Sequence, residues 1–246
     1  MAPTNVIVSN LAAYSPAETI ELVSRAGVKK GNMRLDKIFL SAVSAGCLLA
    51  FACAATLSTN TAPWMQTNAP GLIRTIAALI FPFGLCLIVM TGADLFTGSH
   101  MVLHRRCCPP RAWHQIFLRG IGCNWLVCLA CFLGTQAKDL GSKLAGVWWP
   151  TFAFVALGLD HVVANMFFIP IGIHLGTPGL SVGLYIWKGI IPVGLGNIVG
   201  GALFVGTFYW YMYLLGEPEV VVDGDNAATK EGEKDAGCVE GSVLGG

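Results

Sequence analysis

Apolar residues occur along the chain in long blocks, which is not the short periodicity of a soluble domain. A membrane-spanning helix needs about 20 predominantly apolar residues in a row. Polar segments separate five such blocks, at 38–58, 71–104, 114–134, 144–175 and 189–215. The pattern predicts an all-α integral membrane protein with five spans. The regions expected from it are an N-terminal segment 1–36, a transmembrane domain 37–215 and a C-terminal tail 216–246.

Two of the apolar blocks are too long for one straight crossing. As helices, 71–104 and 144–175 would measure about 50 Å and about 48 Å, whereas the hydrocarbon core is about 30 Å thick. A glycine and an acid interrupt each block, in Gly92-Ala93-Asp94 and in Gly158-Leu159-Asp160-His161. Broken backbone at membrane depth survives only where protein buries it or where it lines a cavity. Paired breaks in two halves of a chain are typical of a transporter's substrate site.

The segments outside the apolar blocks predict the side of the membrane that each end occupies. Ser15-Pro16-Ala17-Glu18 is a capping box that begins a short amphipathic helix along the membrane surface. Basic residues occur at 29–37 and again at 104–111, and the positive-inside rule places both segments in the cytoplasm. Five spans would then leave the acidic tail outside, and its composition predicts disorder.

Composition and charge exclude several classes of protein. Only 12% of the residues are charged, about half the share of an ordinary soluble domain. The net charge of +1 argues against nucleic-acid binding, which needs a concentrated basic face. Cys128 and Cys131 form a CxxC pair with no second ligand pair nearby, so we expect neither a metal nor another cofactor. No nucleophile–base pair favours an enzyme. We expect a protein that crosses the plasma membrane several times.

His161 is the most informative polar residue because it lies in the second break, at mid-membrane depth. Ionisable groups at that depth are costly and usually functional, and histidine changes charge near neutral pH. An anion there would meet an imidazolium or take a proton from it. Asp160 could cap the half-helix that follows, and Asn165 could fix the tautomer of His161. Asn124 and Asn197 could line the path or only bond across helices.

Four short motifs follow one another in a fixed order. They are Gly92-Ala93-Asp94-Leu95-Phe96-Thr97-Gly98, Cys123-Asn124, Asp160-His161-Val162-Val163-Ala164-Asn165-Met166, and Gly196-Asn197 with Gly200-Gly201. In these motifs the chain resembles the formate/nitrite transporter family, and the resemblance covers most of residues 15–215. It implies an aquaporin-like, inverted-repeat helical bundle with two broken helices. It also implies a homopentamer with a pore in each protomer.

The resemblance further implies a substrate class and a set of pore residues. Members of the family pass small monovalent anions such as formate, nitrite, acetate, lactate or hydrosulfide, by a channel-like or proton-coupled route. The implied polar pore residues are Thr97, Asn124, Asp160, His161, Asn165 and Asn197. The implied apolar constrictions are Phe81, Leu85, Leu95, Phe96, Val127 and Phe154. Apolar rings beside a polar centre strip water from the anion and block the leakage of other ions.

The chain departs from the family pattern after Arg106. The family has six spans, three in each inverted half, whereas here 104–111 leads directly into a segment that resembles the fourth span. The third span is therefore expected to be missing, which would turn the second half over relative to the first. Residues 107–111 also lack the lysine that members often carry there. The alternative function is a non-conducting membrane subunit that keeps part of the fold.

Overall fold

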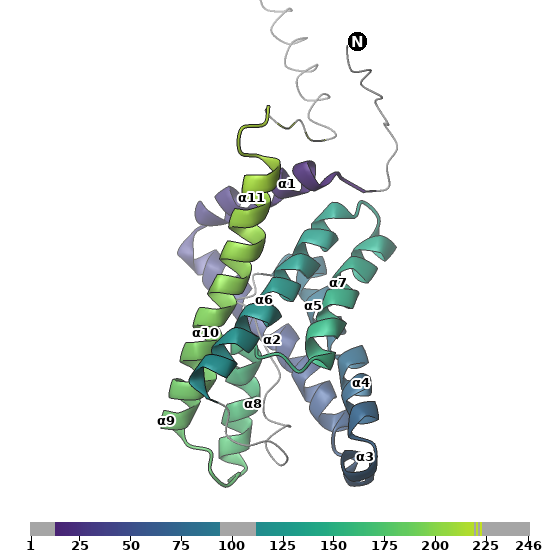
Figure 1. The fold of residues 1–246 in the computed structure, drawn as a ribbon, viewed down its shortest axis with the longest axis vertical. Coiled ribbons are helices and arrows are strands. Elements are labelled where there is room, and N and C mark those ends of the chain that lie inside the picture. Colours follow the sequence, from purple (N-terminus) through teal and green to yellow (C-terminus); the bar gives the residue numbers. More distant parts are fainter. Residues whose placement is uncertain (1–12, 94–111, 219, 221, 223–246) are drawn as a thin grey trace, which may run out of the picture.

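The computed structural model describes residues 13–93, 112–218, 220 and 222, and the regular elements of these residues are helices (Figure 1). The first half contains α1 (Pro16–Gly31), α2 (Leu35–Thr59), α3 (Pro63–Asn68), α4 (Pro70–Ile80) and α5 (Pro82–Thr91). The second half contains α6 (Trp113–Gln136), α7 (Leu140–Ala156), α8 (Val162–His174), α9 (Val182–Leu184), α10 (Ile191–Ile198) and α11 (Phe208–Tyr213). Two π-helical segments join α9, α10 and α11 into one stretch, η2 (Tyr185–Ile190) and η3 (Val199–Thr207).

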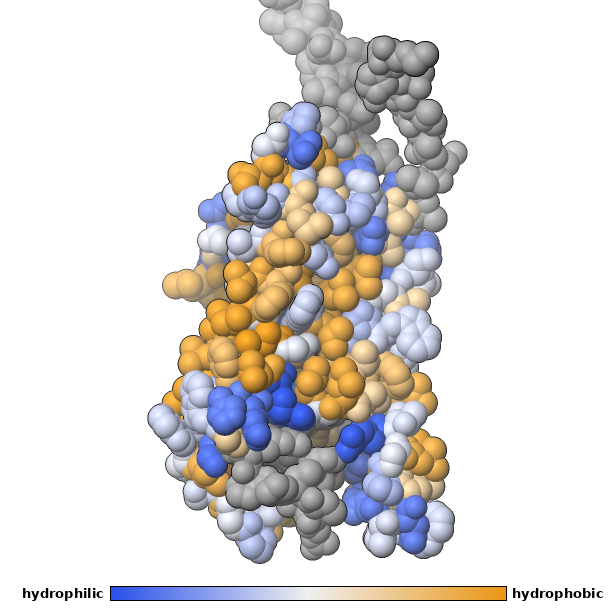
Figure 2. Space-filling view, viewed as in Figure 1, coloured by the Kyte–Doolittle hydropathy of each residue, from blue (hydrophilic) through white to orange (hydrophobic). Residues whose placement is uncertain are grey.

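The long helices coincide with the predicted apolar blocks. Among the described residues, four stretches are long and apolar enough to cross a membrane, namely Leu35–Thr59, Pro70–Thr91, Trp113–Gln136 and Val182–Tyr213. The pair α7 and α8 adds a broken stretch. Large apolar side chains remain exposed outside the bundle, and Figure 2 shows them across the middle of the visible face. The last stretch begins at Val182 and not at residue 189, so Lys188 lies within a helix.

Both broken helices end their first half in the same way. Gly92 closes α5 with φ 69°, and Gly158 follows α7 with φ 64°, a left-handed conformation that favours glycine. The next residue, Ala93 or Leu159, donates its N–H to the carbonyl five positions earlier, at 3.1 Å and 3.0 Å. These are Schellman-type helix ends. The predicted parallel between the two breaks therefore holds as far as Ala93.

The amphipathic helix α1 lies across one end of the bundle (Figure 1). Its predicted capping box is confirmed, because Glu18 N–H donates to Ser15 Oγ at 3.2 Å and Ser15 N–H donates to Glu18 Oε2 at 2.7 Å. Just before it, Tyr14 N–H donates to the carbonyl of Gln136 at 2.8 Å. The end of α6 is therefore attached to the start of α1, and we call this side of the bundle the α1 end.

Contacts at the α1 end fix the direction of the other helices. The last stretch finishes there, since α11 packs against α1. Cys86 Sγ lies 4.0 Å from the carbonyl oxygen of Leu144, in the first turns of α7, so α5 also runs toward the α1 end. The stretch formed by α4 and α5 thus has the same direction as α6, and α7 runs antiparallel to both.

This arrangement corrects our prediction about the C-terminal half. We expected the loss of one span to turn that half over and to leave its end opposite α1. The last stretch instead ends beside α1, and the two broken helices are antiparallel, as an inverted repeat requires. The physical reason is that α5 runs toward the α1 end, whereas α6 begins at the opposite end.

Residues 104–111, which the sequence assigned to the same side as the N-terminal basic residues, lie outside the described residues. Lys29 and Lys30 lie in the last turn of α1. Trp113 begins α6, a helix of 24 residues whose other end bonds to Tyr14. At 1.5 Å per residue these two ends are about 36 Å apart. Trp113 and the last turn of α1 therefore lie toward opposite ends of the bundle.

Glycines allow α6 to pack directly on the last stretch. A Cβ atom added to Gly196 would collide with the carbonyl oxygen of Phe117, and one added to Gly200 would collide with that of Ile121. Such close approach of helix backbones is how small residues promote packing in membranes. This small-residue face is therefore used inside the protomer, where it positions Asn197 beside the second break.

Candidate functional site

The break between α7 and α8 lies deep inside the bundle. Asp160 and His161 are buried, with 0% and 1% of their surfaces exposed. His161 is the N-cap residue of α8 and has an extended backbone, with φ −132° and ψ 126°. The structure thus places His161 where the sequence predicted, on irregular backbone at the junction of two half-helices.

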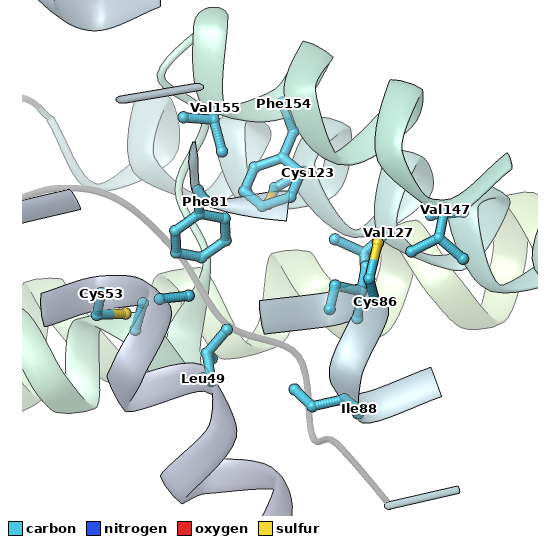
Figure 3. Close-up of a cluster of buried hydrophobic side chains, with 14 of the residues drawn as sticks. Leu49, Cys53, Phe81, Cys86, Ile88, Cys123, Val127, Val147, Phe154 and Val155 are labelled. Carbon is cyan, nitrogen blue, oxygen red and sulfur yellow. The ribbon is translucent and has the colours of Figure 1, made fainter. Parts of the chain in front are cut away.

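Two phenylalanines stack in series with His161. The ring of Phe154 lies parallel to the imidazole, with centroids 5.1 Å apart and an interplanar angle of 24°. Phe81, between α4 and α5, meets Phe154 edge to face at 5.8 Å and 87°. Figure 3 shows these two phenylalanines facing each other, with Cys123 beside Phe154. The contacts join both broken helices, because Phe81 belongs to the first and Phe154 to the second.

The predicted constriction residues fall into two groups. Phe81, Leu85, Val127 and Phe154 all belong to one buried apolar cluster, part of which is drawn in Figure 3. An apolar wall on both sides of the aromatic contact fits a constriction that strips water from an ion. The other two predicted constriction residues, Leu95 and Phe96, lie outside the described residues, as does the predicted pore residue Thr97.

Asn197 supplies hydrogen bonds to the broken backbone. Its Oδ1 accepts from the N–H of Val162, the first residue of α8, at 3.0 Å. Its Nδ2 donates to the carbonyl oxygens of Gly120 at 2.8 Å and Asp160 at 3.2 Å. We had expected Asp160 to cap α8, but the amide of Val162 is bound by Asn197 of α10. The reason is that the glycine contacts bring α10 within reach of the break.

The other two amides also bond to the last stretch. Asn124 Nδ2 donates to the carbonyl of Asn197 at 2.6 Å, and Asn165 Nδ2 donates to that of Gly189 at 2.9 Å. Both acceptors lie in or next to π-helical segments, where carbonyls lose their regular α-helical partners. The amide nitrogen of Asn165 is directed to Gly189, and the suggestion that Asn165 fixes the tautomer of His161 stays a prediction. Bonding across helices is the role that the structure supports for Asn124.

Arg119 is the site residue that the sequence reading did not assign. Its Nε donates to Oδ2 of Asp160 at 2.6 Å, and its side chain is 25% exposed. An arginine inside an apolar block needs a partner, because charge in a membrane interior is costly. That signal was present in the sequence. The partner could not be identified from it, since Asp160 lies 41 positions away.

The polar groups of the site, on Asp160 and His161, lie beside the buried apolar cluster. Among residues 13–93 and 112–218, the structure brings together no three His, Cys, Asp or Glu side chains that could hold a metal ion. Cys128 is partly buried and Cys131 is exposed. The chemistry available at the break is therefore that of an imidazole, a paired carboxylate and backbone amides at the start of a half-helix.

Comparison with known proteins gives close matches along the chain. The formate/nitrite transporter family matches residues 17–111 and, separately, 110–211. A probable formate transporter of Methanothermobacter thermautotrophicus is 32% identical over 81% of this chain and 97% of that protein. The formate channel FocA of Haemophilus influenzae is 28% identical over 86% of this chain and 99% of that protein. A solved pentameric formate channel with formate bound has a TM-score of 0.61 and 27% identity, covering 72% of this chain and 97% of that one.

Two details of these matches concern the junction after Arg106. The two segments matched to the family meet at residues 110–111. The alignment with the Methanothermobacter protein extends over 269 residues, more than the 246 residues of this chain, so that protein has residues that this chain lacks. The paired breaks, the buried histidine and the matches agree with one another, and the chain belongs to the formate/nitrite transporter family.

Proposed function

We propose that each protomer passes small monovalent anions of the formate/nitrite class along a path beside His161, and that the protein assembles as a homopentamer. The observation that carries this proposal is the buried series Phe81–Phe154–His161, which joins an apolar constriction to a titratable group. The relatives named as formate channels and the formate-bound pentamer support formate as the first substrate to test.

Each part of the site has a chemical task in this proposal. The apolar cluster around Phe81 and Phe154 removes water from the entering anion. At the break, the start of α8 presents the positive end of a helix dipole. His161 then meets the anion as an imidazolium or gives it a proton, because histidine is the side chain whose ordinary titration lies near neutral pH. The first alternative is channel-like permeation, and the second is proton-coupled transport of the neutral acid.

Uptake into proteoliposomes tests this function. Formate, nitrite, acetate, lactate and hydrosulfide would be compared with and without an imposed pH gradient, against protein-free vesicles. We expect saturable or channel-like formate entry above the protein-free background, with discrimination by anion size. No entry of any of these anions through a folded, reconstituted protein would contradict the proposal. Native mass spectrometry in mild detergent should show five copies, and a clean monomer would contradict the pentamer.

A second candidate function is a non-conducting subunit, and a specific observation favours it. The division of the family match at 110–111 and the length of the alignment support the absence of the third span. In six-span relatives that span completes one half of the inverted repeat. A folded pentamer that carries no anion would select this alternative, whereas formate entry would exclude it.

A further inference from the structure

The ion pair between Arg119 and Asp160 places two opposite charges beside the proposed anion path. Asp160 immediately precedes His161 and is 0% exposed, so its carboxylate is removed from water. Arg119 Nε lies 2.6 Å from Oδ2 of that carboxylate, and the arginine side chain reaches it from the second turn of α6. Removing one member of a buried pair leaves an uncompensated charge, which is far costlier than losing a surface pair.

The sign of the charge left behind matters for an anion. Two unit charges about 6 Å apart in a medium of effective dielectric constant about 20 interact strongly enough to change a rate by about a hundredfold. The titratable groups around Asp160 are Arg119 and Cys123 from α6 and the neighbouring His161. The packed helix α10 contributes no titratable side chain, since its sequence is IPVGLGNI. Arg119 therefore supplies a permanent positive charge directly against this carboxylate.

We propose that Arg119 is a specificity-determining residue, which cancels the charge of Asp160 so that anions and not cations pass the second break. The net charge of the pair is zero, while Asp160 keeps its hydrogen-bonding oxygens beside His161. This inference rests on the proposed anion transport, and it adds the group that sets the charge selectivity of that path.

The test uses four variants of the full chain in proteoliposomes. Arg119→Gln removes the positive charge, Asp160→Asn removes the negative charge, and the double variant removes both and leaves two neutral amides. Arg34→Gln is the matched control, because Arg34 and Asp36 form an ion pair of 2.9 Å with side chains 78% and 56% exposed. Formate flux, the formate-to-sodium permeability ratio from reversal potentials, and the melting temperature in detergent are measured for each.

We expect Arg119→Gln to lower both the formate flux and the permeability ratio by on the order of tenfold to a hundredfold. The double variant should recover most of both, and Asp160→Asn alone should keep the path selective for anions. A purely structural ion pair would change flux without changing the permeability ratio. Equal impairment of the single and double variants, or an unchanged ratio in Arg119→Gln, would overturn the proposal.

Two further outcomes are decided by the same set of proteins. If Arg119→Gln does not fold, the double variant decides, because an active and anion-selective double variant supports charge cancellation and an inactive folded one contradicts it. If the wild type carries no formate, the proposed transport fails by itself. The charge cancellation is then judged by the melting temperature in detergent. The melting temperature of Arg119→Gln should be roughly 10 °C below that of the double variant. Equal melting of the two would contradict it.

Discussion

The side-chain oxygen of Asn197 lies 3.0 Å from the backbone nitrogen of Val162, and this contact caps α8 from a different helix. The nitrogen of the same side chain donates to the carbonyls of Gly120 and Asp160. Free helix ends inside a membrane need such partners because no water is present to replace them. One amide therefore connects α6, the break and the last stretch, and holds the backbone that presents His161.

Asn197→Ala should destabilise the protein strongly. Three buried backbone groups would lose a partner, and an unsatisfied buried group costs about 1–3 kcal/mol. We expect the free energy of unfolding to fall by about 3 kcal/mol or more, which corresponds to roughly 6–12 °C of melting temperature. The control is Asn68→Ala, which removes an exposed amide that bonds to the carbonyl of Trp64 at 2.9 Å. If both variants lost the same free energy of unfolding, the three hydrogen bonds of Asn197 would contribute no more than the single exposed one of Asn68.

Gly92→Ala and Gly158→Ala should behave alike, because both glycines have left-handed backbones. Placing a Cβ atom in that conformation costs about 1–2 kcal/mol. Gly46→Ala is the control, since a Cβ atom at Gly46 in α2 would meet nothing within 4 Å, and alanine is the better helix former. Thermal melting should rank Gly46→Ala at or above wild type and both break variants below it. A break variant as stable as Gly46→Ala would refute the role assigned to that turn.

The two breaks were predictable from sequence because their signals are local. A glycine in an overlong apolar block marks the turn at Gly158, and four residues suffice for the capping box at Ser15. The contacts that complete the site are not local. Arg119 and Asp160 are 41 positions apart, and Asn197 and Gly120 are 77 positions apart. Periodicity carries no information about such pairs, since they depend on which helix faces pack together.

The prediction of helix direction in the C-terminal half was wrong for a related reason. Counting apolar blocks assumes that each connection returns on the side where the previous span ended. Here α5 runs toward the α1 end, and α6 starts at the opposite one. The direction of the last stretch is seen from its tertiary contacts, with α11 against α1 and with Gly196 and Gly200 against α6. A count of hydrophobic segments cannot report that packing.

Acid should weaken the cap of α7 outside the membrane. Ser142 N–H donates to Asp139 Oδ2 at 2.8 Å, and this hydrogen bond lowers the pKa of Asp139 below its usual value. A lowered folded-state pKa means that the cap contributes fully above the unfolded-state pKa of about 3.9 and is lost as pH falls through the folded-state value. Asp139→Asn keeps an accepting oxygen that does not titrate. Between about pH 6 and about pH 3 the melting temperature of the wild type should fall by more than that of Asp139→Asn. An equal fall in both proteins would contradict this.

Restoring a third span should stabilise the protein and raise transport. The construction would insert the corresponding span of the Methanothermobacter relative at residues 110–111, where the two family matches meet. The proposed absence of that span would leave backbone groups at the first break without a protein wall, and each group unsatisfied in lipid costs several kcal/mol. We expect higher detergent melting and faster formate uptake from the restored form. Equal melting and equal uptake would show that the span is dispensable.

The central claim is that anions pass beside His161, and formate uptake as a function of pH in His161→Phe tests it most directly. Phenylalanine preserves the ring contact with Phe154, which has a centroid separation of 5.1 Å in the native protein, and it removes the titratable nitrogens. The variant should melt close to wild type and should lose, or strongly alter, the pH dependence of formate flux. A folded His161→Phe protein with the wild-type pH dependence would contradict the account.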